Sequence, residues 1–250
     1  MTQKNKQIAN HTGLSQQRVV VLGGSSGIGL AVAQQVVAQG ASAVIASSSA
    51  DRVKQAAATL DGKAEGHTLD LSNECDIQSF FQNIGDFDHL VLTAGDTLQL
   101  NELAATDLNK ARRAFELRYW AVLAAVKYAS SHIREGGSIV LTTGIAGERP
   151  HKAWTLAASV CGAIVSLTRA LAVELAPIRV NAVSPGVVRT NLWKNMQDGD
   201  REAMYSQVGK SLLVGRVGEA CEIARAYLFL MQEGYSTGQT VVVDGGGVLV

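Results

Sequence analysis

The stretch Arg18–Gly40, RVVVLGGSSGIGLAVAQQVVAQG, decides the fold. A short run rich in Val leads directly into glycines, which predicts a buried strand at 18–22. Segment 30–40 has apolar residues at helical spacing and stops at Gly40, which predicts a helix with a glycine C-cap. A glycine-rich turn between a strand and a helix lets backbone N–H groups approach a pyrophosphate, so the order indicates a dinucleotide-binding unit.

The same alternation continues along the chain. Further strands are predicted at 42–47, 89–95, 137–144, 178–186 and 239–246, and helices at about 51–60, 76–84, 107–134, 155–175 and 219–232. The strands contain Val and Ile without polar alternation, which favours a parallel sheet covered on both faces. With right-handed crossovers, the pattern predicts a single-domain α/β fold of the Rossmann type, a doubly wound parallel sheet with helices on both faces. The domain is expected over 17–250, after a flexible lead-in at 1–16.

Composition narrows the class of protein. Hydrophobic residues make up 47% of the 250 residues and charged residues 18%, which supports a large core and excludes disorder. The net charge is zero and no basic patch stands out, so neither nucleic acid nor an anionic membrane is an expected partner. No uninterrupted apolar run approaches the length of about 18 residues that a spanning helix needs. The dispersed Cys and His residues lack metal-ligand spacing, and we expect a soluble, cytoplasmic protein without a metal.

Several motifs together resemble the short-chain dehydrogenase/reductase family. The turn Gly23-x-x-x-Gly27-x-Gly29 has that family's spacing. The segment LDLSN at 69–73 is similar to the family segment whose Asp contacts adenine, and IRVNAVSPGVVRT at 178–190 is similar to its Pro-Gly segment near the nicotinamide. The C-terminal segment STGQTVVVDGG also matches. The resemblance extends from about Gln17 to Gly247.

The resemblance implies NAD(P)(H) binding and hydride transfer between the nicotinamide and a carbonyl or alcohol carbon. The cofactor-binding residues that it implies are Gly23, Ser25, Ser26, Gly27, Ile28, Gly29, Ser47, Ser48, Asp70, Gly95, Pro185, Gly186 and Thr190. It does not indicate a particular small-molecule ligand or substrate. It also implies a homo-oligomer, a tetramer or a dimer, joined through the helices at 107–134 and 155–175 and the C-terminal strand.

The end of the second strand bears on the choice of nucleotide. A carboxylate there would bind the ribose 2′-hydroxyl of NAD, whereas neutral or basic residues accommodate a 2′-phosphate. Ser47 and Ser48 occupy this place, with Arg52 nearby. We therefore expect NADP(H) rather than NAD(H), although a plain solvated Ser-rich loop is an alternative. Leu22 replaces the family's Thr, and Leu92 with Thr93 replaces its Asn pair, which affects structural support more than chemistry.

The reaction centre departs most from the family pattern. In the resembling enzymes a Tyr carries the proton, a Lys lowers its pKa from about 10, an Asn extends the proton relay and a Ser orients the substrate. By motif, the Tyr and Lys positions hold Ala157 and Cys161, the Ser position holds Gly144, and the Asn position holds Arg118. Since none of the four side chains is retained, the chain is expected to be a catalytically degenerate member of the family.

Other interpretations stay open from the sequence. The chain is alternatively an active NADP-dependent oxidoreductase with an atypical proton donor, such as His151 or water, or a non-redox enzyme in the same pocket. Each nearby candidate also has a plain structural interpretation. Cys161 is then an inert buried thiol, and Thr142 and Thr143 simply finish a strand. The others are a surface histidine, a helix-packing residue, a side chain that fills volume and a solvated arginine, at His151, Tyr119, Trp154 and Arg118 respectively.

Overall fold

The computed structural model describes residues 13–95, 98 and 100–250, and these residues form a seven-stranded sheet in the order β3-β2-β1-β4-β5-β6-β9. All neighbouring strands pair in parallel. The strands are β1 (Arg18–Leu22), β2 (Ser42–Ser47), β3 (Ala64–Thr68), β4 (Phe87–Leu92), β5 (Ile133–Thr142), β6 (Arg179–Pro185) and β9 (Thr240–Val243). The predicted Rossmann-type α/β fold is confirmed.

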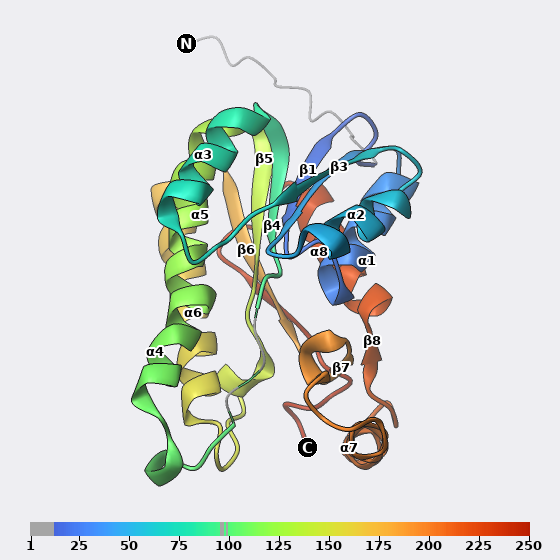
Figure 1. Ribbon diagram of the computed structural model, residues 1–250, viewed down its shortest axis with the longest axis vertical. Helices are drawn as coiled ribbons and strands as arrows, with labels where there is room; N and C mark the ends of the chain where they lie inside the picture. Colours follow the sequence, from blue (N-terminus) through green and yellow to red (C-terminus); the bar gives the residue numbers. More distant parts are fainter. Residues whose placement is uncertain (1–12, 96–97, 99) are drawn as a thin grey trace.

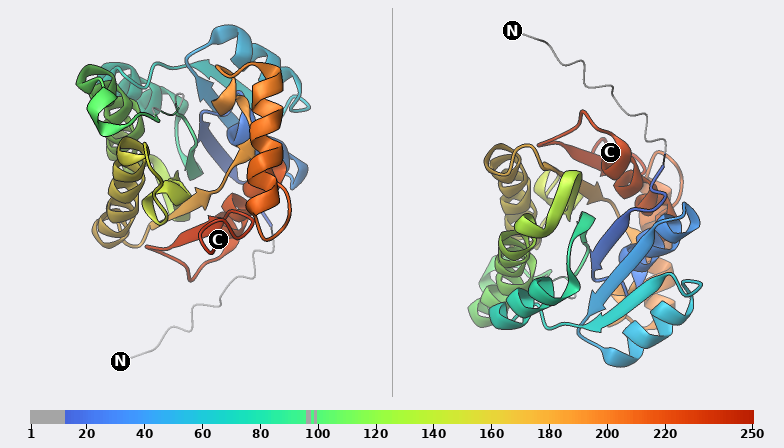
Figure 2. Two further views of the ribbon diagram at one scale, coloured as in Figure 1. Left: turned by 90° about the horizontal axis from the view of Figure 1, so that it is seen from below. Right: turned by 90° about the horizontal axis from the view of Figure 1, so that it is seen from above.

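Helices cover both faces of the sheet (Figures 1 and 2). On one face lie α1 (Gly27–Ala38), α2 (Ala50–Ala58) and α8 (Ala220–Gln232), whose apolar residues share one core with alternate residues of the strands. On the other lie α3 (Glu74–Ile84), α5 (Ala121–Ala129) and α6 (Thr155–Glu174), which share the second core. This two-sided burial explains why the central strands are apolar without alternation.

The order of the strands reverses between β1 and β4. From β1 the chain proceeds outward to β2 and β3, and then returns to place β4 on the other side of β1. Loops at the carboxyl ends of strands diverge at such a switch point and leave a crevice for a ligand. The glycine-rich turn after β1 and the loop after β4 both lie at this edge. The topology therefore places the candidate site there.

A segment beyond the carboxyl ends of the strands was not predicted from the sequence. It comprises β7 (Val188–Arg189), the 3-10 turn η5 (Asn191–Trp193), α7 (Asp198–Ser211) and β8 (Gly218–Glu219), and it lies below α1 and α8 in Figure 1. Helix α7 buries only Tyr205 and Gly209, so its sequence has no apolar stripe that periodicity would reveal. The edge strand β3, AEGHT, was missed for the similar reason that it is mostly polar.

The helix predicted at 107–134 is interrupted. It consists of α4 (Leu108–Phe115), a π-helical turn η2 (Glu116–Trp120), α5 and a short 3-10 turn at Ser130–His132. A π-helical turn shifts the side chains that follow it relative to a regular α-helix, and such turns are frequent at functional sites. Arg118 lies within this turn.

The domain begins before Gln17. Leu14 is 1% exposed and belongs to the core beneath α1, and the N–H of Gln16 donates to the carbonyl of Gly40 at 3.1 Å. Residues 13–16, which were expected to belong to the lead-in, therefore pack against the domain, because the Leu14 side chain is buried in its apolar core. Residues 1–12 of that lead-in lie outside the described residues.

Helix α6 is long and apolar enough to cross a membrane by length and composition. It lies along the sheet next to α5, and its inner face buries Val160, Ile164, Leu167 and Leu171 in the second core (Figure 1). Its outer face keeps apolar residues, of which Val173 is 82% exposed. The outer face is therefore more apolar than packing on the sheet requires.

Candidate dinucleotide site and reaction centre

A pocket of about 510 Å³ opens at the carboxyl ends of β1, β2 and β4. It is lined by Gly23, Ser25, Ser26, Gly27, Ile28, Gly29, Ser47, Ser48, Arg52, Leu69, Asp70, Leu71, Ser72, Thr93, Ala94, Gly95, Leu117, Thr190, Asn191, Leu192 and Lys194. Most of the residues that the family resemblance implied for the cofactor are thus brought together. Pro185 and Gly186, also implied, lie outside the lining.

The glycine-rich turn needs its glycines for two different reasons. Gly23 and Gly27 have φ values of +90° and +54°, which side chains disfavour. A β-carbon on Gly29 would collide with the carbonyl oxygen of Gly23 and with Thr93 Oγ1. Helix α1 begins here without a side-chain cap at Ser26, so its first N–H groups face the pocket unpaired by a cap. Free N–H groups at the positive end of a helix suit a pyrophosphate.

The substitution of Thr93 for a family Asn retains a supporting hydrogen bond. Thr93 Oγ1 donates to the carbonyl oxygen of Leu22 at 3.1 Å, and the Thr93 N–H donates to the same oxygen at 2.9 Å. Leu22 itself is fully buried in the second core. The loop after β4 is therefore hydrogen-bonded to the end of β1 through a hydroxyl instead of an amide. This bond supports the glycine-rich turn that follows β1.

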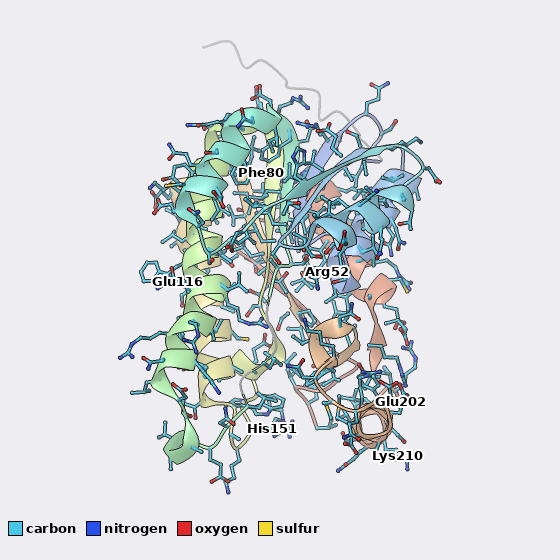
Figure 3. The ribbon with its side chains drawn as sticks, in the orientation of Figure 1. Arg52, Phe80, Glu116, His151, Glu202 and Lys210 are labelled. Atoms are coloured by element: carbon cyan, nitrogen blue, oxygen red, sulfur yellow. The ribbon has the colours of Figure 1, made fainter. Side chains whose placement is uncertain are left out.

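The end of the pocket around Asp70 is polar. Asp70 Oδ1 accepts hydrogen bonds from the N–H and hydroxyl of Ser72 at 2.9 and 2.7 Å, and these bonds lower the pKa of the Asp70 carboxyl. At neutral pH Asp70 is therefore an ionised acceptor in a fixed orientation. Ser47 ends β2 and Ser48 follows it, and both line the pocket together with Arg52 of α2, which is labelled in Figure 3. Among the described lining residues, Asp70 is the single carboxylate.

Two of the four altered reaction positions are in direct contact. A β-carbon on Gly144 would lie 3.4 Å from Cys161 Sγ, and one on Gly147 would lie 3.1 Å from Cys161 Cβ. Ala157 is one helical turn before Cys161 on the same face of α6 and is buried. The mapped Ser, Tyr and Lys positions are thus neighbours in space, as the resemblance requires, but carry no hydroxyl, phenol or ammonium group.

The Arg118 side chain lies next to Gly95, a residue that lines the pocket. Its guanidinium Nη1 and Nη2 lie 2.9 and 3.1 Å from the point where a β-carbon on Gly95 would stand. Its positive charge also acts on the Cys161 thiol. Of the two interpretations of Arg118, a solvated outward side chain is wrong, because the π-helical turn directs the side chain toward the loop after β4. A guanidinium thus stands where the family places an amide.

Cys161 is an inert thiol in this environment. Burial raises the pKa of Cys161, and the lowering effects of Thr143 and of the Arg118 charge do not overcome it. Reactive cysteines require a lowered pKa and solvent access. Thr143 Oγ1 donates to the carbonyl oxygen of Cys161 at 2.9 Å, so this hydroxyl ties the strand end to α6.

The remaining candidates have structural roles. Thr142 Oγ1 donates to the carbonyl of Leu92 at 2.5 Å and lies 2.6 Å from the hydroxyl of buried Tyr227. His151 is exposed in the loop before α6, with its ring against Trp154 at a centroid distance of 4.7 Å (Figure 3). Neither aromatic ring lines the pocket. Tyr119 packs edge-on against Trp120 at 5.2 Å, which is helix packing. Over residues 13–95, 98 and 100–250, no cluster of three His, Cys, Asp or Glu residues is arranged for a metal ion.

A doubly wound parallel sheet with an uncapped helix N-terminus and a glycine-lined pocket at its switch point defines a Rossmann-type dinucleotide-binding protein. The chain matches the sequence model of the family described as enoyl-(acyl carrier protein) reductase over residues 23–247. It is 33% identical to the short-chain dehydrogenase/reductase fsr5 of Gibberella fujikuroi, over 94% of this chain and 96% of that protein. The protein belongs to the short-chain dehydrogenase/reductase family of oxidoreductases.

Solved structures agree with this assignment. A small-chain dehydrogenase in complex with NADPH is 38% identical, with a TM-score of 0.84, and covers 94% of this chain and 100% of its own. The MalC reductase/Diels-Alderase of Malbranchea aurantiaca is 29% identical, with a TM-score of 0.88, and covers 95% of this chain and 98% of its own. The similarity thus extends over nearly the whole domain, including both ends of the pocket.

Proposed function

We propose that the protein is an NADP(H)-binding member of the family that has lost the tyrosine-dependent reaction on carbonyls and alcohols. The observation that carries the proposal is the contrast within one site. The turn from Gly23 to Gly29 and the loop residues around Asp70 form a dinucleotide pocket, whereas Gly144, Ala157 and Cys161 leave the adjoining reaction centre without its proton-transfer groups.

NADP(H) is favoured by the polar end of the pocket. Ser47 and Ser48 offer hydroxyl donors after β2, and Arg52 offers a cation without an ion-pair partner among the described residues. A carboxylate in place of Ser47 or Ser48 would repel a 2′-phosphate, and both of these residues are uncharged. The structural relative that holds NADPH has the same fold over nearly its whole length. These features support a dinucleotide with a 2′-phosphate.

The loss of activity follows from the available proton donors. A positioned acid or base contributes about 10²–10⁴-fold in rate. The half-buried Cys161 thiol has a raised pKa, and a guanidinium such as that of Arg118 does not release its proton at neutral pH. A bound nicotinamide would supply hydride chemistry at this centre. The chain itself would provide orientation and charge but no proton, which would come from water.

Binding and turnover test the two halves of this proposal separately. Calorimetric titration with NAD, NADH, NADP and NADPH should show binding, tightest for the NADP pair. Gly27→Asp is the matched negative control, because it puts a carboxylate where the pyrophosphate would lie, at a position with φ of +54°. A panel of aldehydes, ketones and alcohols should give no change in nicotinamide absorbance. Failure to bind any dinucleotide at millimolar concentration contradicts the first half, and turnover of about 1 per second or more contradicts the second.

A second candidate is a non-redox enzyme in the same pocket. A pocket of about 240 Å³ with Leu100, Leu192, Trp193 and Met196 in its wall adjoins the first, and Leu192 lines both. The name of the structural relative MalC joins reduction to a Diels–Alder reaction, which needs no proton relay. Apolar dienes that carry an alkene should be incubated with the NADP-bound protein. A product of unchanged mass, formed without change in nicotinamide absorbance, supports this function, and an absence of product counts against it.

A further inference from the structure

The dinucleotide pocket contains a cation that the family motifs do not include. Lys194, the residue directly after η5, lines the pocket together with Arg52 of α2. Neither side chain is ion-paired within the described part of the chain. Three arginines of the segment that carries Lys194 are ion-paired: Arg189 with Glu202 at 2.7 Å, Arg201 with Asp198 at 2.8 Å and Arg216 with Glu222 at 2.6 Å. Among the described residues, no acidic side chain therefore pairs with Lys194.

The turn that carries Lys194 is fixed against the phosphate-binding end of α1. A β-carbon on Gly27 would lie 3.4 Å from Cβ and Cγ2 of Thr190, so Thr190 stands directly across the turn. The side chain of Thr190 caps η5 by accepting from the N–H of Leu192 at 3.3 Å. The indole of Trp193 donates to the carbonyl of Val188 at 3.1 Å and anchors the same turn. These contacts fix the backbone of Lys194 beside the N-terminus of α1.

The charge balance of the pocket favours a role for this side chain. Asp70 is the carboxylate of the lining, and Arg52 lies at the same end of the pocket. At the reaction end, the position of the family's lysine is occupied by Cys161, which has no charge there because burial raises its pKa. Without Lys194, a pyrophosphate at the glycine-rich turn would meet backbone dipoles and neutral side chains such as Ser25 and Ser26, but no formal positive charge from η5.

We propose that Lys194 binds the pyrophosphate of the dinucleotide and supplies the positive charge that the family's lysine provides elsewhere in related pockets. This inference rests on the proposed nucleotide binding and adds a residue to it. Lysine suits the role, because its ammonium group is a compact charge on a flexible stem that reaches over an open site. Lys194 is a binding residue and takes no part in proton transfer.

The two nicotinamide cofactors separate this role from recognition of the 2′-phosphate. NADH and NADPH share the pyrophosphate, and NADPH alone carries the additional phosphate. Lys194→Gln should weaken the binding of both, about tenfold and by the same factor, because one charged hydrogen bond is lost in each complex. Arg52→Gln should weaken NADPH and leave NADH unchanged. The loss caused by Lys194→Gln should shrink as the ionic strength rises, because salt screens an exposed charge pair.

Matched variants complete the test. Lys194→Arg should retain most of the affinity, since it keeps the charge. Lys210→Gln removes an exposed lysine from α7, remote from Arg52, and should change nothing (Figure 3). Equal affinities of wild type and Lys194→Gln for both nucleotides would overturn the inference, as would a loss confined to NADPH. If wild type binds neither nucleotide, the proposed function fails as well. Thermal unfolding at the wild-type temperature would show that each variant is folded.

Discussion

Cys161 Sγ lies 3.4 Å from the point where a β-carbon on Gly144 would stand. The family resemblance places a lysine and a serine at these positions, and here a thiol lies beside a glycine that has no side chain. The guanidinium of Arg118 lies against Gly95. The proposed loss of proton-transfer chemistry at neighbouring positions makes reconstruction of the four groups a direct test.

Restoring two of the four groups should not restore turnover. We expect Ala157→Tyr with Cys161→Lys to remain below about 1 per second on aldehydes and ketones, because Gly144 and Arg118 still leave the substrate clamp and the relay incomplete. The further changes Gly144→Ser and Arg118→Asn complete the set, and measurable NADPH oxidation is then expected. Ala157 is 8% exposed, so the added phenol should cost about 1–3 kcal/mol of folding free energy. Absorbance of the reduced cofactor reports the rate, and circular dichroism checks the fold.

The wild-type rate is the reference for this series. A wild-type turnover equal to that of the fourfold variant would show that a different donor already operates. His151→Gln then separates the alternatives, since loss of activity would identify the exposed imidazole and unchanged activity would identify water.

Acid should destabilise the fold through a buried histidine. His89 lies in the sheet with Nδ1 2.8 Å from Ser138 Oγ and Nε2 3.0 Å from Gln17 Oε1. Burial, with a contribution from the charge of Arg179, lowers the pKa of His89 to about 4. Between pH 6.5 and 4 the unfolded chain binds a proton that the folded chain rejects, so stability falls as pH falls and then levels off. The loss is about 3 kcal/mol.

Urea denaturation at several pH values measures this effect. His89→Gln should be less stable at pH 7, because one of the two hydrogen bonds is disturbed, but its stability should change less between pH 6.5 and 4. His67→Gln, which alters a partly exposed histidine, should keep the wild-type slope. An identical slope in wild type and His89→Gln would contradict the assignment.

The hydroxyl of Tyr227 should contribute measurably to stability. Since Thr142 gives its proton to the carbonyl of Leu92, Tyr227 donates to Thr142 at 2.6 Å. Tyr227 is fully buried, and burial raises the pKa of its phenol. Tyr227→Phe should lower the free energy of unfolding by about 1 kcal/mol. Tyr235→Phe is the matched control, because Tyr235 is 98% exposed, and it should have no effect.

We propose that the protein is a homo-oligomer that uses its outer apolar surfaces. Leu108 of α4 and Trp120 of η2 are 64% and 54% exposed, and Val173 of α6 and Val242 of β9 also face outward. Light scattering at micromolar concentration should give a dimer or a tetramer. Trp120→Asp should shift it to a smaller species, and Ala58→Asp, on exposed α2, should not. A monomeric wild type would contradict the proposal.

The fold and the glycine-rich turn could be predicted from the order of residues, and so could the expectation that the tetrad positions lack their usual side chains. Strand composition, helical spacing and the glycines at 23, 27 and 29 are local requirements of a chain that must bury both faces of a sheet and approach a phosphate closely. The absence of Tyr and Lys from α6 is likewise visible in the order of residues. Helix α7, which has no apolar stripe, lay beyond this kind of inference.

Only the tertiary structure decided which side chains share the pocket. Arg118 meets Gly95 because a π-helical turn redirects it, and Lys194 joins Arg52 across a cavity because η5 is held against Gly27. Thr142 finds its hydrogen-bond partner in Tyr227, 85 residues later in the chain. The periodicity of apolar residues indicates which face of a single helix or strand is buried. Contacts between distant segments depend instead on how the layers pack and where the loops close, and no local pattern encodes them.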